Sequence, residues 1–377
     1  MRTPTFTKGG SRSLDRLLPL ILLPVALIAL GPVVRLLLEG IGFGDGLTSE
    51  HLTTVLSRPS TGTALLHSLI TAGGGTVLSI LIGASFAFLV ALTDIRGKGA
   101  LVFCLMIPMM IPPQITALAW MQMAGPSSTL LKLIGLAPPL GSPQPLHSPG
   151  GIILLLGIQH ASLVFLTLRA GLRMIPADLV EAARMSGAGS LRVWAQTVLP
   201  LSMPSLIAGG AMAFVTALGN FGIPAMLGIP AGYATLPTLI YQRLVGMGPS
   251  VLPEVAVLSL LIGAVAILGI LISRYVLSRK GFGLVGLSGN PLALSLGRGR
   301  NAIEVLLWGF IFVILGLPLF ALLATSLIPA YGVPLTFTTA TFDAWKEVLF
   351  VQPGTRRAYG NSLMLATSAA AILLVAS

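Results

Sequence analysis

Apolar stretches long enough to cross a membrane recur along this whole chain, and they constrain its fold more than any other feature. A spanning helix needs about 20 apolar residues to cross roughly 30 Å of hydrocarbon. Of the residues, 55% are hydrophobic and only 9% are charged, too little charge to cover a soluble domain. The sequence therefore predicts an all-α, polytopic transmembrane helical bundle. The predicted spans lie near residues 17–38, 63–93, 100–122, 150–170, 202–226, 252–277 and 303–327, and an eighth begins near residue 361.

The basic residues are unevenly distributed between the segments that connect these spans. If the N-terminus is cytoplasmic, most of the 22 lysines and arginines fall in cytoplasmic segments, among them Arg96, Lys98 and Arg169. Such a bias is typical of cytoplasmic loops in membrane proteins. We therefore expect a cytoplasmic N-terminus and a lipid environment. The net charge of +11 then reports orientation, and no nucleic-acid partner is expected.

The chain restarts its pattern after a basic, glycine-rich linker. His67-Ser68-Leu69 opens the second span and Asn361-Ser362-Leu363 opens the eighth, which suggests an internal duplication. Ser377 falls inside an apolar run, and a helix that ends in lipid leaves carbonyls unpaired. We therefore expect an incomplete second half, from truncation or from a longer protein. The expected boundaries are a cytoplasmic N-terminus at 1–16, a first unit of six spans at 17–277, a cytoplasmic linker at 278–302 and an incomplete second unit of about two spans at 303–377.

A polar segment at residues 169–200 interrupts the apolar pattern between the fourth and fifth spans. Pro176 suits the first position of a helix, and Gly187 can adopt the left-handed conformation that ends one. Ser190 can cap a second helix over residues 191–198, which Pro200 separates from the fifth span. The segment is predicted to be a cytoplasmic helix-turn-helix whose first helix has about 11 residues. Leu179, Ala182 and Ala183 are spaced to share one face of that first helix.

The same segment resembles the EAA loop of binding-protein-dependent ABC transporter permeases. The family pattern is EAA, three residues, Gly, and then an Ile and a Leu-Pro; Thr197 replaces the expected Ile. The position of the motif between spans four and five makes the resemblance specific, and it covers roughly residues 60–280. The residues that match the family at its spacing are Glu181, Ala182, Ala183, Gly187, Leu199 and Pro200.

This resemblance implies that each predicted unit is a permease unit in a bacterial cytoplasmic (inner) membrane. In the family, the loop is a coupling helix that seats in a cytoplasmic ABC ATPase dimer. The resemblance assigns Glu181 to capping and docking, Ala182 and Ala183 to close contact, and Gly187 to the turn. An extracytoplasmic solute-binding protein would deliver the substrate, and a second permease copy could supply a second coupling helix. No G-x-x-x-x-G-K-[ST] motif occurs in the chain, so the expected ATPase is a separate protein and the permease itself is non-catalytic, without a cofactor.

The substrate is less constrained than the transporter class. The two-half layout, with Phe221-Gly222-Ile223-Pro224 and Leu236-Pro237-Thr238-Leu239-Ile240-Tyr241, looks most like the ferric iron permease branch. Importers of thiamine, polyamines and aminophosphonates have similar permeases and remain alternatives. An ion-coupled secondary transporter is the rival class, but it would need buried carboxylates, and none lies at the centre of the first six spans.

Two spans carry helix-breaking residues and a polar side chain. Span three contains Pro108, Pro112 and Pro113, and span five contains Gly219 to Pro224. Broken helices at membrane depth often line substrate routes, so we hypothesise that Gln114 and Asn220 line the translocation path. The alternative is kinked packing in which neighbouring helices satisfy both amides. His160 is interpreted as a neutral histidine that is hydrogen-bonded across helices, and no metal site is expected from the histidines or from the single Cys104.

Overall fold

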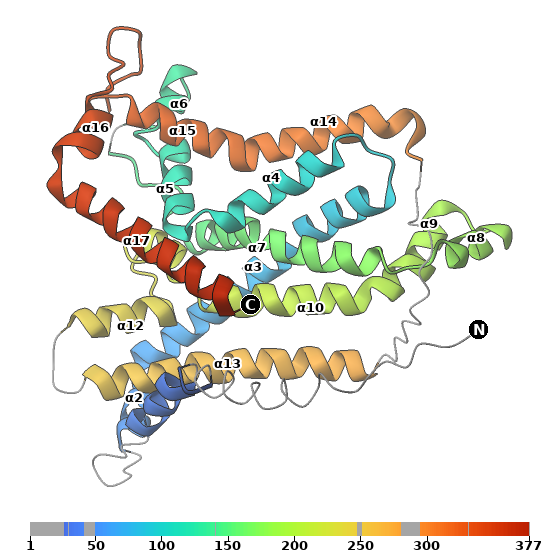
Figure 1. The fold of residues 1–377 in the computed structure, drawn as a ribbon, viewed down its shortest axis with the longest axis horizontal. Helices are drawn as coiled ribbons and strands as arrows, with labels where there is room; N and C mark the ends of the chain where they lie inside the picture. Colours follow the sequence, from blue (N-terminus) through green and yellow to red (C-terminus); the bar gives the residue numbers. More distant parts are fainter. Residues whose placement is uncertain are drawn as a thin grey trace, which may run out of the picture. The chain divides into compact units, whose positions relative to one another are not determined.

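The computed structural model of the chain describes residues 26–28, 30–40, 50–139, 141–246, 251–279, 295–330 and 332–376. These residues are mostly helical, and no β-strand forms among them, which confirms the predicted all-α class. The chain divides into two compact parts, which we call the small and the large unit. The small unit joins Met1–Ile70 to Ala234–Val276, and the large unit joins Thr71–Tyr233 to Leu277–Ser377. Figure 1 shows the helices of both units.

Five helical stretches in the described part of the chain are long and apolar enough to cross a membrane, and they match five of the predicted spans. The first part of the predicted first span, up to residue 25, lies outside the described residues, and residues 26–28 and 30–40 are helical. The predicted eighth span lies within α17 (Pro353–Ala376), which begins before residue 361. The five stretches are α3 (Pro59–Leu92), α7 (Pro149–Leu172), Trp194–Leu218 with α10 (Leu199–Leu218), α13 (Val251–Arg279), and Gly297–Ser326 with α14 (Arg300–Ile311) and α15 (Leu317–Ser326).

The predicted third span is sharply bent. α4 (Lys98–Met110) is followed by the segment Pro113–Leu133, which contains α5 (Pro113–Ala124) and α6 (Thr129–Leu133), and the two parts meet at 103°. A proline disfavours helical backbone in the residue before it, and Ile111, before Pro112, is extended at φ −83° and ψ 131°. The next proline, Pro113, begins α5, where its missing N–H breaks no helical bond. The prolines predict a break, but not its angle.

Glycines on α3 bring α7 close in the centre of the large unit. A Cβ built on Gly83 would lie 2.5 Å from the carbonyl oxygen of Ala161, and one built on Gly75 would lie 2.9 Å from the Cβ of Leu156. Small residues permit such close approach between membrane helices, where packing drives association. The glycines at these two positions therefore allow α3 and α7 to approach closely. Gly73 differs, because nothing lies within 4 Å of its Cβ position.

The start of the predicted second permease unit packs on the helices of the predicted first one. In the large unit, α14, a π-helical turn (Phe312–Gly316) and α15 run beside α4 and α5 (Figure 1). The ring of Phe310 lies 5.5 Å from that of Phe86 on α3. Leu307 and Ile311 are buried in the same apolar core as α3, α4 and α7. Most side chains of α16 (Asp343–Lys346), the π turn η5 (Glu347–Val351) and α17 are exposed.

The small unit has its own apolar core and a partly buried ion pair. It contains α2 (Glu50–Ser57), the first turns of α3, α12 (Leu236–Val245) and most of α13. Arg58 lies 2.8 Å from a carboxylate oxygen of Glu254, which is also 3.7 Å from Arg243. The pair joins the starts of α3 and α13 to the end of α12. The core residues are Val55, Ala64, Leu236, Leu239, Val257 and Leu258.

The expected linker at 278–302 overlaps helix at both ends. α13 continues to Arg279, and a short 3-10 turn (Gly297–Gly299) leads into α14. Residues 280–294 lie outside the described part of the chain. The expected domain boundaries therefore stay predictions.

Candidate functional site

The polar segment 169–200 begins with α8 (Ala177–Met185), close to the first helix that the sequence predicts. Asp178 lies in its first turn and Arg184 in its last, where each charge complements the helix dipole. The helix has 9 residues, fewer than expected. Pro176 is its N-cap, at φ −65° and ψ 137°, rather than its first residue. The fixed φ of proline suits a helix start, but the extended ψ leaves Pro176 outside the helix.

Gly187 ends α8 as the sequence predicts. Its φ is +81°, and its N–H donates to the carbonyl of Arg184 at 2.9 Å. The N–H of Ala188 donates to the carbonyl of Ala183 at 3.2 Å. These two bonds make a Schellman motif, which pairs carbonyls that the end of a helix otherwise leaves free. Glycine fits here because it has no Cβ to oppose a positive φ.

The outward side of α8 carries part of the predicted motif. Glu181, Ala182 and Leu179 are exposed, and Met185 is 84% exposed. Leu179, Ala182 and Met185 follow one another at intervals of three residues, so they form an apolar strip beside Glu181. Ala183 was expected to share a face with Leu179 and Ala182. It is instead half-buried and packs on the apolar core, because it lies further round the helix.

The second helix of the segment is continuous with the fifth span, contrary to the prediction. α9 (Ser190–Val193) passes through a π-helical turn, η2 (Trp194–Val198), directly into α10. The N–H of Leu199 bonds to the carbonyl of Trp194, five residues earlier. Pro200 does not break the helix because it lies in the first turn of α10, where a proline is tolerated. The described residues do not include the side chain of Ser190, so its predicted capping stays a prediction.

An apolar base holds this helix-turn-helix in place. Val180 on α8 is fully buried, and Val193 and Val198 belong to the same core as Leu92 and Ile95 at the end of α3. The ring of Trp194 meets that of Phe88 edge-on, with centroids 5.4 Å apart. Contacts of this kind fix the position of a surface helix. α8 is therefore a packed element that presents one side, not a loose loop.

Gln114 and Asn220, the two candidate path residues, lie at the same break in the chain. α10 ends at Leu218, and α11 (Gly222–Leu227) begins after a short turn. The Oδ1 of Asn220 accepts the backbone N–H of Ile223 at 3.2 Å, so Asn220 caps α11. Gln114 is exposed, and a Cβ built on Gly222 would lie 2.8 Å from its Cδ. The structure brings the two amide side chains close to one turn. The hydrogen bond from Ile223 accounts for the side-chain oxygen of Asn220.

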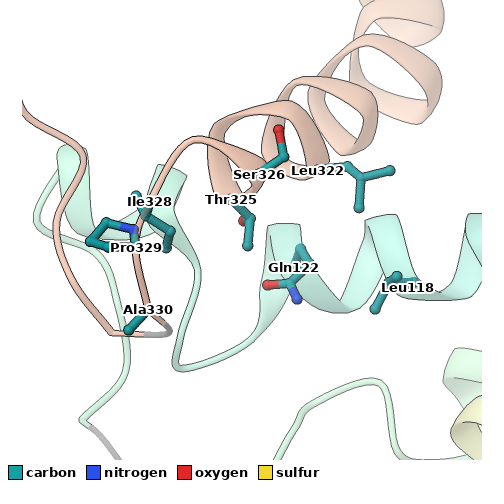
Figure 2. Close-up of a pocket in the computed structure, with 8 residues that line it drawn as sticks. All are labelled: Leu118, Gln122, Leu322, Thr325, Ser326, Ile328, Pro329 and Ala330. Carbon is teal, nitrogen blue, oxygen red and sulfur yellow. The ribbon is translucent and has the colours of Figure 1, made fainter. Parts of the chain in front are cut away.

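A cavity of about 320 Å³ lies beside α5 and the end of α15. Figure 2 shows Gln122 of α5 facing the turn of α15 that carries Thr325. The lining of the cavity has three polar side chains and no charged one, so the cavity offers hydrogen bonds without a fixed charge. The sequence did not single out this cavity, because α5 and α15 are distant in the chain. The residues that line it are Leu118, Gln122, Leu322, Thr325, Ser326, Ile328, Pro329 and Ala330.

A charged cluster joins the segment between α3 and α4 to the start of α14. Asp94 Oδ1 accepts the backbone N–H of Leu296 at 3.0 Å, and Arg300 lies 3.7 Å from Asp94 Oδ2. Glu304 Oε1 accepts the Nε–H of Arg300 at 2.9 Å and the backbone N–H of Arg96 at 2.7 Å. The sequence places Glu304 only near the end of a span. Arg300 lies one helical turn earlier, but Arg96 is 208 residues away, and no local pattern reveals that contact.

The electrostatics of this cluster favour a charged Asp94. The hydrogen bond from Leu296 is the main cause that lowers the pKa of Asp94 below its ordinary value. Partial desolvation opposes this effect, and the positive charges of Arg300 and Lys98 lower the pKa further. The carboxylate is therefore a fixed negative charge at neutral pH.

His160 has the surroundings of a packed helix residue. Its side chain is buried, and Nδ1 lies 2.9 Å from the carbonyl oxygen of Leu156 one turn earlier. Within the described ranges, no group of three or more His, Cys, Asp or Glu side chains is placed to hold a metal ion. The predicted hydrogen bond of His160 forms, but within its own helix and not across helices as expected.

The sequence is similar to known inner-membrane transport proteins. Residues 75–280 match the family of binding-protein-dependent transport system inner membrane components. The molybdenum transport system permease protein ModB of Mycobacterium tuberculosis is 29% identical over 222 residues, which are 57% of this chain and 81% of that protein. The putrescine transport system permease protein PotI of Escherichia coli K12 is 31% identical over 219 residues, which are 57% and 71%.

A third relative and a solved structure extend this similarity. PhnU of Salmonella choleraesuis, named for a 2-aminoethylphosphonate transport system, is 30% identical over 234 residues, which are 60% of this chain and 79% of that protein. A bacterial alginate ABC transporter, solved in complex with an alginate-bound periplasmic protein, has a chain that aligns with a TM-score of 0.57 at 19% identity. The alignment covers 72% of this chain and 97% of that one, and it supports the fold alone. Iron appears in none of these names.

Proposed function

We propose that this chain, which belongs to the family of binding-protein-dependent transport system inner membrane components, couples a cytoplasmic ATPase to solute import through α8. The chain is a multi-pass, inner-membrane permease subunit of an ABC importer. The observation that carries the coupling role is the exposed side of α8, where Glu181 and Ala182 stand above a buried apolar base. A short amphipathic helix presented in this way can seat in a groove on a partner protein.

The side chains of α8 fit a docking role. The apolar strip of Leu179, Ala182 and Met185 would lie in the groove, and the small side chain of Ala182 would permit close approach. Glu181, beside the strip, would pair with a donor on the ATPase. Ala183, Gly187, Leu199 and Pro200 would act from within, since they fix the end of α8 and join it to α10. A push on α8 would then reach the fifth span through the Gly187 turn and the continuous helix of α9, η2 and α10.

The proposed docking role of α8 determines which partners we expect. An ABC ATPase dimer would bind on the cytoplasmic side, with the N-terminus of the chain on that side as well. An extracytoplasmic solute-binding protein would deliver the solute to the other face. Because this chain carries one such loop in its sequence, a second permease copy or the rest of a second permease unit would provide the second docking helix. The first permease unit would comprise 17–277 and the second would begin at 303, after a linker at 278–302.

Two residues are proposed for the path itself. Asn220 lies at the break between α10 and α11, Gln114 lies beside Gly222 two residues later, and the exposed side chain of Gln114 can face a solute. Non-helical backbone at membrane depth is tolerated where it lines a cavity or is buried in protein. Asn220 would shape the path by capping α11, while Gln114 would contact the solute.

The solute is proposed to be a small polar or charged molecule. The named relatives belong to molybdenum, aminophosphonate and putrescine systems, and this range favours the aminophosphonate and polyamine alternatives over ferric iron. Membrane vesicles that contain the assembled importer test this choice of solute. Their uptake is measured with a molybdenum compound, an aminophosphonate, putrescine and ferric iron. ATP-independent uptake would support an ion-coupled transporter instead.

Charge reversal tests the coupling role. Glu181→Lys should abolish co-purification of the tagged chain with its co-expressed ATPase while membrane insertion is retained. Asp343→Lys is the matched control, because Asp343 has an exposed side chain on α16. Equal ATPase recovery with both variants would exclude the proposed docking of α8.

A further inference from the structure

Two polar atoms on α5 are buried without a partner. Thr116 Oγ1 and Trp120 Nε1 have no hydrogen-bond partner among the described residues. Both side chains are more than nine-tenths buried, with 8% and 7% of their surface exposed. The two residues are four positions apart, so they lie one above the other on the same side of the helix. An unpaired polar group is costly in the interior of a membrane protein.

Both side chains line one small cavity of about 20 Å³, beside the bend between α4 and α5. Its other walls come from α4, α7, the π turn Phe312–Gly316 and α15. A cavity needs about 10–15 Å³ of such space to hold one water molecule, together with two to four polar partners. This cavity is large enough for one water molecule and too small for a larger solute.

The cavity wall also contains two helix prolines, Pro108 and Pro318. A proline has no N–H to donate to the carbonyl four residues earlier. Pro318 therefore leaves the carbonyl of Ile314, another residue of the lining, without its usual backbone donor. The cavity wall thus holds an indole donor and a hydroxyl, and one of its residues, Ile314, has a carbonyl that lacks its usual helical donor.

We propose that this cavity binds one ordered water molecule that joins α5 to α15. The water accepts the indole N–H of Trp120 and donates one hydrogen to the carbonyl of Ile314. Its remaining hydrogen-bonding capacity pairs with the hydroxyl of Thr116. Such a water satisfies the groups that the prolines and the bend leave unpaired, and it ties the bent third span to a helix of the predicted second permease unit.

The substitution Thr116→Val distinguishes a wet cavity from a dry one by the sign of its effect. The two side chains have nearly the same shape, so the change removes the hydroxyl and little else. With the water bound, the variant loses a hydrogen bond and its Tm falls by about 2–4 °C. In a dry cavity, loss of an unpaired hydroxyl leaves the Tm unchanged or raises it, and that result would overturn the proposal.

A control and two further measurements complete the test. Thr167→Val is the control, because its hydroxyl donates to the Leu163 carbonyl at 2.8 Å within its own helix. A double-mutant cycle of Thr116→Val with Trp120→Phe should be non-additive if one water serves both groups, whereas additive effects would contradict it. Should the variants fail to insert, a high-resolution map of the unmodified protein decides: the proposal requires density between Thr116 Oγ1 and Trp120 Nε1.

Discussion

Ala188 donates its backbone N–H to the carbonyl oxygen of Ala183 at 3.2 Å, across the left-handed Gly187. This bond closes α8, and the packing of Val180 and Ala183 on the apolar core decides which side of the helix faces outward. Ala183 lies against the apolar core, while Ala182 and Glu181 are exposed. The turn after α8 and the packing beneath it together set the geometry of the proposed docking surface.

Replacement of Gly187 by alanine should weaken both the turn and the docking. A Cβ at φ +81° costs about 1–2 kcal/mol, and no atom lies within 4 Å of its position, so the effect is purely that of the backbone. We expect a lower Tm in detergent and lower recovery of the ATPase. Gly189→Ala is the control, because Gly189 also has free space and no positive φ. Indistinguishable variants would contradict this account of the turn.

Close packing of α3 on α7 predicts a large effect at Gly83. A Cβ there would lie 2.5 Å from the carbonyl oxygen of Ala161, and overpacking of this kind costs about 1–3 kcal/mol. Thermal unfolding of Gly83→Ala should show this loss. Gly73→Ala on the same helix should be tolerated, since nothing lies within 4 Å of its Cβ position. A Gly83→Ala protein as stable as the Gly73→Ala protein would argue against the observed packing.

The charged cluster predicts a dependence of stability on pH. The pKa of Asp94 is lowered in the folded protein, mainly by the N–H of Leu296. Asp94 therefore stabilises the fold above its unfolded pKa of about 3.9, and this contribution is lost as the pH falls through the lower, folded pKa. Asp94→Asn should remove that part of the pH dependence in denaturation midpoints measured between about pH 2 and 5. Asp343→Asn should leave it unchanged; the same slope in all three proteins would refute the assignment.

The two amides at the break between α10 and α11 should differ in their effects. Asn220→Ala removes the hydrogen bond to the backbone N–H of Ile223 at the start of α11, and this loss should cost about 1 kcal/mol of stability. Gln114→Ala changes an exposed side chain, so stability should persist while solute uptake falls. Uptake and ATP turnover are measured together in vesicles. If both variants transport normally at normal ATP turnover, neither residue lines the path.

Local features of the fold were predictable where the sequence determines them locally. The end of α8 followed from Gly187, and the break in the third span followed from its prolines. The predicted separation of the second helix from the fifth span at Pro200 was wrong, because a proline in the first turn of a helix need not break the helix that precedes it. The hydrogen bond between Leu296 and Asp94 joins residues 202 positions apart, and only tertiary packing brings them together. The exposed position of Ala182 and the buried one of Ala183 likewise depend on what lies beneath α8.

The central claim is that an ATPase covers the outward side of α8, and thiol labelling of that side tests it most directly. In a chain whose single cysteine is removed by Cys104→Ser, Ala182→Cys introduces one exposed thiol. Its rate of reaction with a maleimide should fall at least tenfold when the ATPase is bound. Ala344→Cys on α16, also exposed, should react at the same rate with and without the ATPase. An unchanged rate at position 182 in the assembled complex would contradict the coupling role of α8.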